Sequence, residues 1–112
     1  MNLDEKTYST MAVRELDNLL EQIDEFDPDE VEGFLQMGVL RVTFFEKELC
    51  VINSHSAARE IWMAWDGHAW HFAWDGERKD WRCTRTDAEL YETVSTMISK
   101  RLDRDVVLKR LG

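Results

Sequence analysis

Proline and cysteine are scarce in this sequence, and histidine is hardly more frequent. The 112 residues include one proline, two cysteines and three histidines. Cys50 and Cys83 lie far apart without a partner motif, which favours two buried thiols in a reducing compartment over a disulfide framework. The cytoplasm of a prokaryote is the expected location, and a processed organellar chain is the alternative.

Long apolar runs are also missing. None reaches the roughly 18 residues that a membrane-spanning helix needs, so we expect no membrane partner. The first residues, Met1 to Thr7, are polar and acidic, which predicts neither a secretory signal nor an arginine-rich transit peptide. The length predicts a single domain over residues 1–112. No phosphate-loop, nucleophile-elbow or zinc-protease motif is present, so we expect no covalent chemistry.

Basic side chains are nearly absent from the first third of the chain. Residues 1–32 hold eleven acidic side chains and two basic ones, whereas residues 33–112 hold twelve of each, so the whole net charge of −9 lies in the first third. Such a surface would repel the phosphate backbone of a nucleic acid. Cations or a basic protein surface are therefore its expected partners.

Hydrophobic periodicity divides the chain into two helices with strands between them. Residues 5–26 repeat apolar side chains every three or four positions, which predicts an amphipathic helix ended by Pro28. Residues 88–102 predict a second helix, capped by Asp87. Alternation and turn residues predict strands at 30–36, 39–44, 49–53, 59–65, 70–74 and 80–83, followed by an extended tail at 105–111.

The order of these elements predicts the fold class. Short connections between the strands favour antiparallel neighbours. The expected architecture is an α+β two-layer sandwich, with two terminal helices packed on one face of an antiparallel sheet of five or six strands.

Acidic side chains continue from the first helix into the first strand. Asp17, Glu21 and Asp24 have the spacing of one helical stripe that faces away from the core. The predicted acidic ridge comprises Asp17, Glu21, Asp24, Glu25, Asp27, Asp29, Glu30 and Glu32. The acidic segment does not match the calcium-binding loop of an EF-hand, because Glu30 stands where that loop requires a glycine. An open ridge of carboxylates suits loosely bound iron and other divalent ions, and a solvated charged face is the alternative.

A hairpin around residues 50–64 carries the second candidate surface. Alternation places Ile52 and Ile61 toward the core, which puts Asn53, Glu60 and Trp62 together on the outward face. An outward tryptophan rimmed by an amide and a carboxylate suits a partner anchor. The alternative is a second core face covered by a helix or loop.

The histidines predict no metal site of their own. A zinc site built from His55, His68 and His71 would need the two cysteines as further ligands. The two cysteines are too far apart in the sequence to match the spacing of a zinc-binding pair. We expect structural or solvated histidines.

The run VIN-x₇-IW-x-A, from Val51 to Ala64, resembles the signature hairpin of the frataxin family. The likeness extends over nearly the whole chain in the family's order. It also includes Tyr8, Met11-Ala12, Leu16-Asp17, Leu19 and Glu21 in the first helix, Gly38 to Leu40 with Val42 in the second strand, and Trp81 and Leu90 near the end.

This resemblance implies the α+β architecture and a role as an iron-binding accessory protein of iron–sulfur cluster assembly. The acidic ridge would bind iron weakly and dock on a basic cysteine desulfurase. The partner-binding set Asn53, His55, Glu60 and Trp62 would contact the cluster-assembly site that the desulfurase forms with its scaffold protein. We expect a monomer, with oligomers in the presence of iron as an open alternative.

Several residues depart from the family's pattern. His55 stands where the family usually has glutamine, Ala57 replaces an expected proline, and Glu60 replaces a glutamine before Ile-Trp. Phe34 places an apolar side chain among the acids of the first strand. Two other functions stay open, namely an acidic interaction domain that mimics a polyanion without iron, and a ferroxidase that oxidises Fe²⁺ on the ridge.

Overall fold

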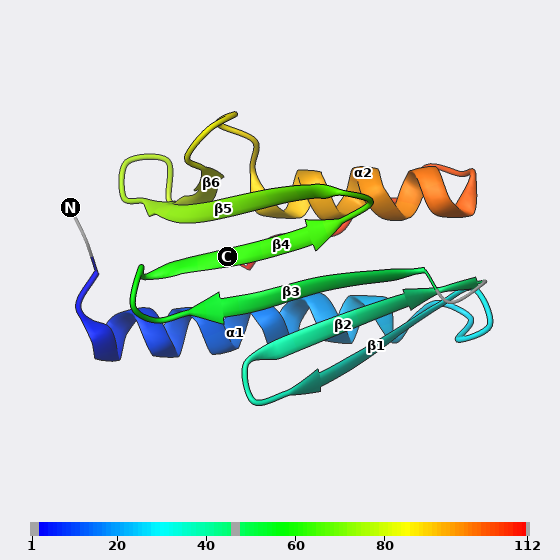
Figure 1. Cartoon of the computed structure of the whole chain (residues 1–112), viewed down its shortest axis with the longest axis horizontal. Helices are drawn as coiled ribbons and strands as arrows, with labels where there is room; N and C mark the ends of the chain where they lie inside the picture. Colours follow the sequence, from blue (N-terminus) through cyan, green and yellow to red (C-terminus); the bar gives the residue numbers. More distant parts are fainter. Residues whose placement is uncertain (1–2, 46–47, 112) are drawn as a thin grey trace.

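The computed structural model describes residues 3–45 and 48–111 as two helices packed on one sheet (Figure 1). Helix α1 spans Glu5–Ile23 and helix α2 spans Leu90–Leu102. The strands are β1 (Val31–Gln36), β2 (Val39–Phe44), β3 (Leu49–His55), β4 (Glu60–Trp65), β5 (His68–Asp75) and β6 (Asp80–Cys83). They form one antiparallel sheet in chain order, with both helices behind it in Figure 1. The predicted α+β two-layer sandwich is confirmed.

Strand alternation decides which side chains enter the core. Ile52, Ile61, Met63 and Phe72 are buried on the side of the sheet that the helices cover. Trp62, between two of them on β4, lies on the opposite face and is only partly buried. The inward and outward assignment predicted for the β3–β4 hairpin is confirmed.

Helix α1 ends at Ile23, three residues before the predicted end. The backbone N–H groups of Glu25 and Phe26 bond to carbonyls three residues back rather than four, so the last turn tightens and the helix stops. The strands differ from prediction by smaller amounts: β1 begins at Val31, β3 extends to His55, β4 begins at Glu60, and β5 spans His68–Asp75.

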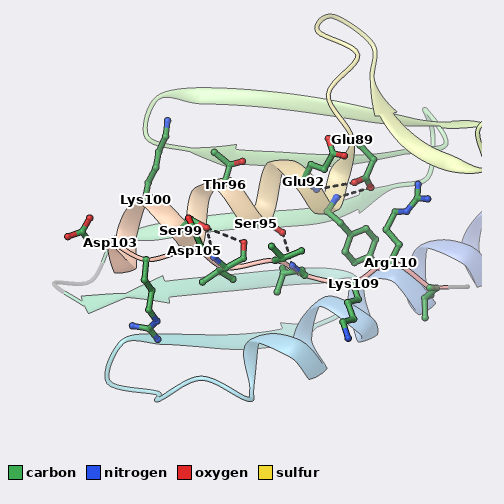
Figure 2. Close-up of a pocket in the computed structure, with 16 residues that line it drawn as sticks. Glu89, Glu92, Ser95, Thr96, Ser99, Lys100, Asp103, Asp105, Lys109 and Arg110 are labelled. Atoms are coloured by element: carbon green, nitrogen blue, oxygen red, sulfur yellow. Dashed lines mark hydrogen bonds between the residues drawn. The ribbon is translucent and has the colours of Figure 1, made fainter.

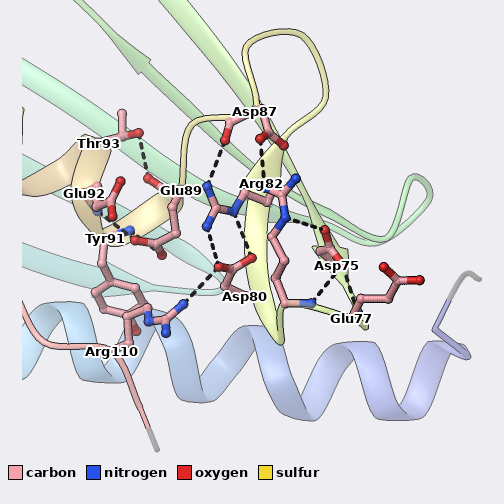
Figure 3. Close-up of polar contacts among 11 residues, drawn as sticks. Asp75, Glu77, Asp80, Arg82, Asp87, Glu89, Tyr91, Glu92, Thr93 and Arg110 are labelled. Carbon is pink, nitrogen blue, oxygen red and sulfur yellow. Dashed lines mark hydrogen bonds and ion pairs between the residues drawn. The ribbon is translucent and has the colours of Figure 1, made fainter.

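Glu89, and not the predicted Asp87, caps helix α2. The Glu89 carboxylate accepts hydrogen bonds from the backbone N–H groups of Tyr91 (2.9 Å) and Glu92 (3.0 Å). Asp87 has a left-handed φ of 66° and bonds to the Arg78 guanidinium at 2.8 Å instead. Figure 3 shows this polar network of acids and arginines between the β5–β6 hairpin and the start of α2.

The C-terminal tail is extended and connects the two helices. The backbone N–H of Leu108 donates to Ser95 of α2 at 2.9 Å, and that of Lys109 donates to Gln22 of α1 at 2.7 Å. Val106 and Leu108 are buried. The predicted extended tail that covers the core is confirmed.

A buried carboxylate joins α1 to the rest of the core. Glu15, on α1, is 8% exposed and accepts hydrogen bonds from the indole N–H of Trp81 (2.9 Å) and from the hydroxyl of Tyr91 (2.5 Å). Burial, together with this hydrogen bond to Glu15, raises the pKa of Tyr91 above its ordinary value. Glu15 is not among the residues singled out from the sequence, although its spacing from Ala12 and Leu19 places it on the inward stripe of the helix.

Among the described residues, neither helix has the length and apolar character that a membrane span requires.

We predict that Glu15→Ala lowers the free energy of unfolding by about 3 kcal/mol, because two buried donors lose their acceptor. Urea denaturation followed by tryptophan fluorescence measures the change. Glu21→Ala, which removes an exposed carboxylate from the same helix, is the matched control and should change stability by less than about 0.5 kcal/mol. Equal effects of the two substitutions would contradict the buried role of Glu15.

Candidate functional site

The helical part of the acidic ridge lies on the outward face of α1 and at its end. Asp17 and Glu21 are exposed one helical turn apart, and Asp24 is the C-cap residue. Glu25 is exposed beside it. Among the described residues, none of these four takes part in an ion pair. The predicted outward stripe is therefore present as uncompensated negative charge.

The second part of the ridge follows in the turn between α1 and β1. Asp27 accepts a hydrogen bond from the backbone N–H of Asp29 at 2.9 Å, which orders the turn. Glu32, the last member, is exposed on β1. Glu30 differs from the others, because it forms a bidentate ion pair with Arg104. The two guanidinium nitrogens lie 2.8 and 3.0 Å from the two carboxylate oxygens. This hydrogen bonding lowers the pKa of Glu30 and occupies its oxygens.

The ridge forms no preformed cage for an ion. Within residues 3–45 and 48–111, no three His, Cys, Asp or Glu side chains lie close enough together to hold one metal. A cation on this surface would have one or two carboxylates and keep most of its water. Oxygen donors of this kind bind first-row divalent ions weakly and exchange them easily.

The outward sheet face contains the second candidate surface. Strand register aligns Asn53 of β3, Trp62 of β4 and His71 of β5 in one row across the sheet. His55 and Glu60 form the neighbouring pair toward the end of the β3–β4 hairpin. The predicted set Asn53, His55, Glu60 and Trp62 is thus gathered in one place, and the structure adds His71 to it.

Trp62 is held on three sides. The imidazole of His55 stacks on one face of the indole, with ring centroids 3.7 Å apart and planes 13° from parallel. His71 stacks at 4.1 Å and 7°. The indole N–H donates to the Glu60 carboxylate at 2.8 Å, and Glu60 lies 4.0 Å from His71 Nδ1. Trp62 thus lies on the outward face as predicted, but it is only partly exposed because the two imidazole rings cover much of the indole.

Tyr8 fixes the hairpin that carries these residues. Its hydroxyl accepts a hydrogen bond from the backbone N–H of His55 (2.9 Å) and donates one to the carbonyl of Glu60 (2.6 Å). The first turns of α1 are thus linked to the last residue pair of β3 and β4. Burial raises the pKa of the Tyr8 hydroxyl, so it stays a neutral donor.

A large groove lies between α2 and the tail, with a volume of about 1100 Å³. The volume would admit a ligand, but the side chains that line the groove do not form a ligand site. Figure 2 shows its side chains of mixed charge. The hydroxyls of Ser95 and Ser99 that face it already bond to the tail backbone. The groove is therefore the seam where the tail packs.

Sequence reasoning missed three residues that shape the two surfaces: Tyr8, His71 and Arg104. The Tyr8 bridge and the Arg104 pair join segments far apart in sequence, so only the fold brings them together. His71 could have been found, because the Asp66-Gly67 turn sets the register that places it opposite Trp62.

The fold and the ridge define the class, namely a small α+β domain whose first helix presents an open acidic surface. The sequence model of the frataxin-like domain matches residues 1–104. The iron-sulfur cluster assembly protein CyaY of Dechloromonas aromatica is 33% identical over 107 residues, covering 96% of this chain and all of the relative. The CyaY protein of Ralstonia pickettii is 32% identical over 110 residues, covering 95% of each chain.

A solved structure of frataxin from Psychromonas ingrahamii supports the same fold. Its TM-score is 0.84 at 19% identity, and the match covers 98% of this chain and all of the other. The chain belongs to the frataxin-like family.

We predict that Arg104→Ala tightens binding of Fe²⁺ to the ridge by roughly twofold, because it frees the Glu30 carboxylate and removes a nearby positive charge. Anaerobic calorimetric titration measures the affinity. Arg85→Ala removes the same charge from an exposed site in the β6–α2 connection and is the control. Weaker Fe²⁺ binding by the Arg104 variant, with its fold intact, would contradict the position given to Glu30.

Proposed function

We propose that this protein is an accessory protein of iron–sulfur cluster assembly that holds iron loosely on its acidic ridge and docks on a desulfurase–scaffold complex. The observation that carries the proposal is the open ridge, on a chain whose relatives are named iron-sulfur cluster assembly proteins. The carboxylates of α1 and the following turn, which apart from Glu30 have no ion pair within residues 3–45 and 48–111, attract both cations and basic protein surfaces.

The two surfaces would have separate partners. The ridge would dock on a basic cysteine desulfurase, and the face around Asn53 and Trp62 would contact the scaffold protein at the cluster-assembly site. The protein would act there by delivering iron or by modulating sulfur transfer. Iron is cargo in this scheme, so weak binding and fast release are useful properties.

A reducing cytoplasm is the location that fits these residues. Cys50 and Cys83 are both buried and free of disulfides. Burial, reinforced by the nearby Glu48 carboxylate, raises the pKa of Cys50 to about 12, so this thiol stays protonated and inert.

The activity of the organism's own desulfurase–scaffold complex, measured with and without this protein at fixed salt, tests the proposal. We expect the desulfurase rate to change by about twofold or more, in a direction set by the partner, and the change to weaken in two variants. One is Trp62→Ala. The other combines Asp17→Ala, Glu21→Ala and Asp24→Ala.

The matched control for the ridge variant combines Glu77→Ala, Glu92→Ala and Asp105→Ala. It removes the same amount of negative charge from exposed positions outside the ridge. The control should act like the wild-type protein. No change in rate by the wild-type protein, together with no co-elution with the complex, would overturn the proposed function.

A second candidate function is a polyanion mimic that binds basic partners without iron. It is favoured by the lack, within the described residues, of three metal-ligating side chains around one point. Partner binding that is the same with and without Fe²⁺ would support the mimic, whereas binding that depends on Fe²⁺ would support the iron-handling role. Oxygen consumption in the presence of Fe²⁺ tests the ferroxidase alternative.

A further inference from the structure

Strand β5 is paired along only part of its length on the side of β6. The four residues of β6 pair with residues 72–75, the second half of β5, and Figure 1 shows β6 beside that half alone. The carbonyl of His71 accepts a hydrogen bond from the backbone N–H of Thr84 at 2.9 Å, and the chain then turns toward α2. Within the described chain, no strand pairs with residues 68–70 on this side.

The free half of β5 presents backbone groups to the solvent. Backbone N–H and C=O groups in an antiparallel ladder point alternately to the two neighbouring strands. Because the carbonyl of His71 points to the β6 side, Ala69, two residues earlier, presents its N–H and C=O there as well. Proteins commonly block such an edge with lysine, proline or other charged residues. Residues 68–71 include no lysine, proline or carboxylate, whereas β1, at the other edge of the sheet, contains Glu32.

A groove of about 310 Å³ lies between this free half of β5 and helix α2. Trp65 and Trp70 line it from the sheet, and Met97 lines it from α2. Trp70 is paired with the buried Met63, so its side chain lies on the side of the sheet that the helices cover. The groove is therefore on the opposite side of the sheet from Trp62.

Two polar groups of the groove have no partner within the described chain. The indole N–H of Trp65 is buried and has no hydrogen-bond acceptor among residues 3–45 and 48–111. A buried donor without an acceptor is unfavourable, so an oxygen atom of an occupant would stabilise the site. Lys100, an exposed residue of α2, lines the groove and forms no ion pair with the described residues. Its ammonium group would attract a carboxylate.

We propose that the free half of β5 and the adjoining groove bind an extended peptide segment of a partner protein, which continues the sheet where β6 stops. The segment's backbone pairs with Ala69. The residue opposite Trp70 faces the helices, so it places a large apolar side chain in the groove. An acidic residue of the segment lies against Lys100. In this mode of recognition, backbone hydrogen bonds give affinity and the side-chain pocket gives specificity. The site is separate from the ridge and needs no iron.

The first experiment titrates a synthetic peptide into the ¹⁵N-labelled full chain. The peptide is capped at both ends, alternates threonine with valine, and has leucine at its centre and aspartate at one end. We expect the backbone amide of Ala69 and the indole N–H of Trp65 to move first. Ala69→Pro removes the N–H that pairs with the peptide and should weaken binding about tenfold. A proline is tolerated where the N–H of an edge strand faces solvent, and thermal unfolding checks that the variant folds.

A second variant blocks the groove without changing the strand. Thr96→Arg introduces a long side chain at an exposed position of α2 that lines the groove, and should also weaken peptide binding about tenfold. Thr10→Arg adds the same side chain at an exposed position of α1 and is the matched control, which should bind like the wild-type protein. Equal affinities of the two arginine variants would overturn the groove as the binding site.

An exchange of charges tests the role of Lys100. We expect Lys100→Glu to weaken binding of the aspartate peptide about threefold at low salt, and to strengthen binding of a peptide with lysine in place of the aspartate. Equal affinity of both proteins for both peptides would overturn the acidic part of the proposed segment.

Three other results would overturn strand addition at β5. The first is an Ala69 amide that stays unchanged at millimolar peptide. The second is movement confined to the indoles of Trp65 and Trp70 and unaffected by Ala69→Pro, which would mean an apolar pocket without strand pairing. The third is an Ala69 signal that moves when the protein alone is diluted, which would place a second copy of this chain at the edge.

Discussion

Mutual repulsion among the acidic side chains on α1 is the constraint that the rest of the fold must balance. Like charges one turn apart destabilise a helix. The inward face of α1 supplies the balance through directional hydrogen bonds: Tyr8 to the β3–β4 hairpin, Glu15 to Trp81 and Tyr91, and Gln22 to the tail. These bonds lie near the beginning, middle and end of the helix, and they hold it to the sheet, to α2 and to the tail while its outward face presents the carboxylates of the ridge.

The same helix relates the two candidate surfaces to each other. Its outward face forms the ridge, while Tyr8, near its start, fixes the hairpin that displays Trp62. Charge is thereby concentrated on the helix and the following turn, and aromatic surface on the open side of the sheet. A protein that meets two partners of different chemistry benefits from this separation, because a change on one surface leaves the other intact.

Fold class and site position followed from the sequence to different degrees. Period-2 alternation in Ile52, Ile61 and their neighbours predicted the sheet correctly, because burial on one face leaves a local signal. The sequence pattern predicts Asp87 as the cap of α2, whereas Glu89 is the cap, because both positions carry an acid and the ion pair of Asp87 with Arg78 cannot be read from sequence spacing. Contacts between distant segments, such as Glu30 with Arg104, leave no periodic trace at all.

In the proposed function the ridge, and not the histidine-bearing face of the sheet, takes iron. Anaerobic titration of Fe²⁺ into ¹⁵N-labelled protein tests it most directly, since a paramagnetic ion broadens the signals of nearby backbone amides. We expect the amides of Asp17, Glu21, Asp24 and Glu32 to broaden first. Initial broadening at His68 and His71 instead, with the ridge unaffected, would contradict it.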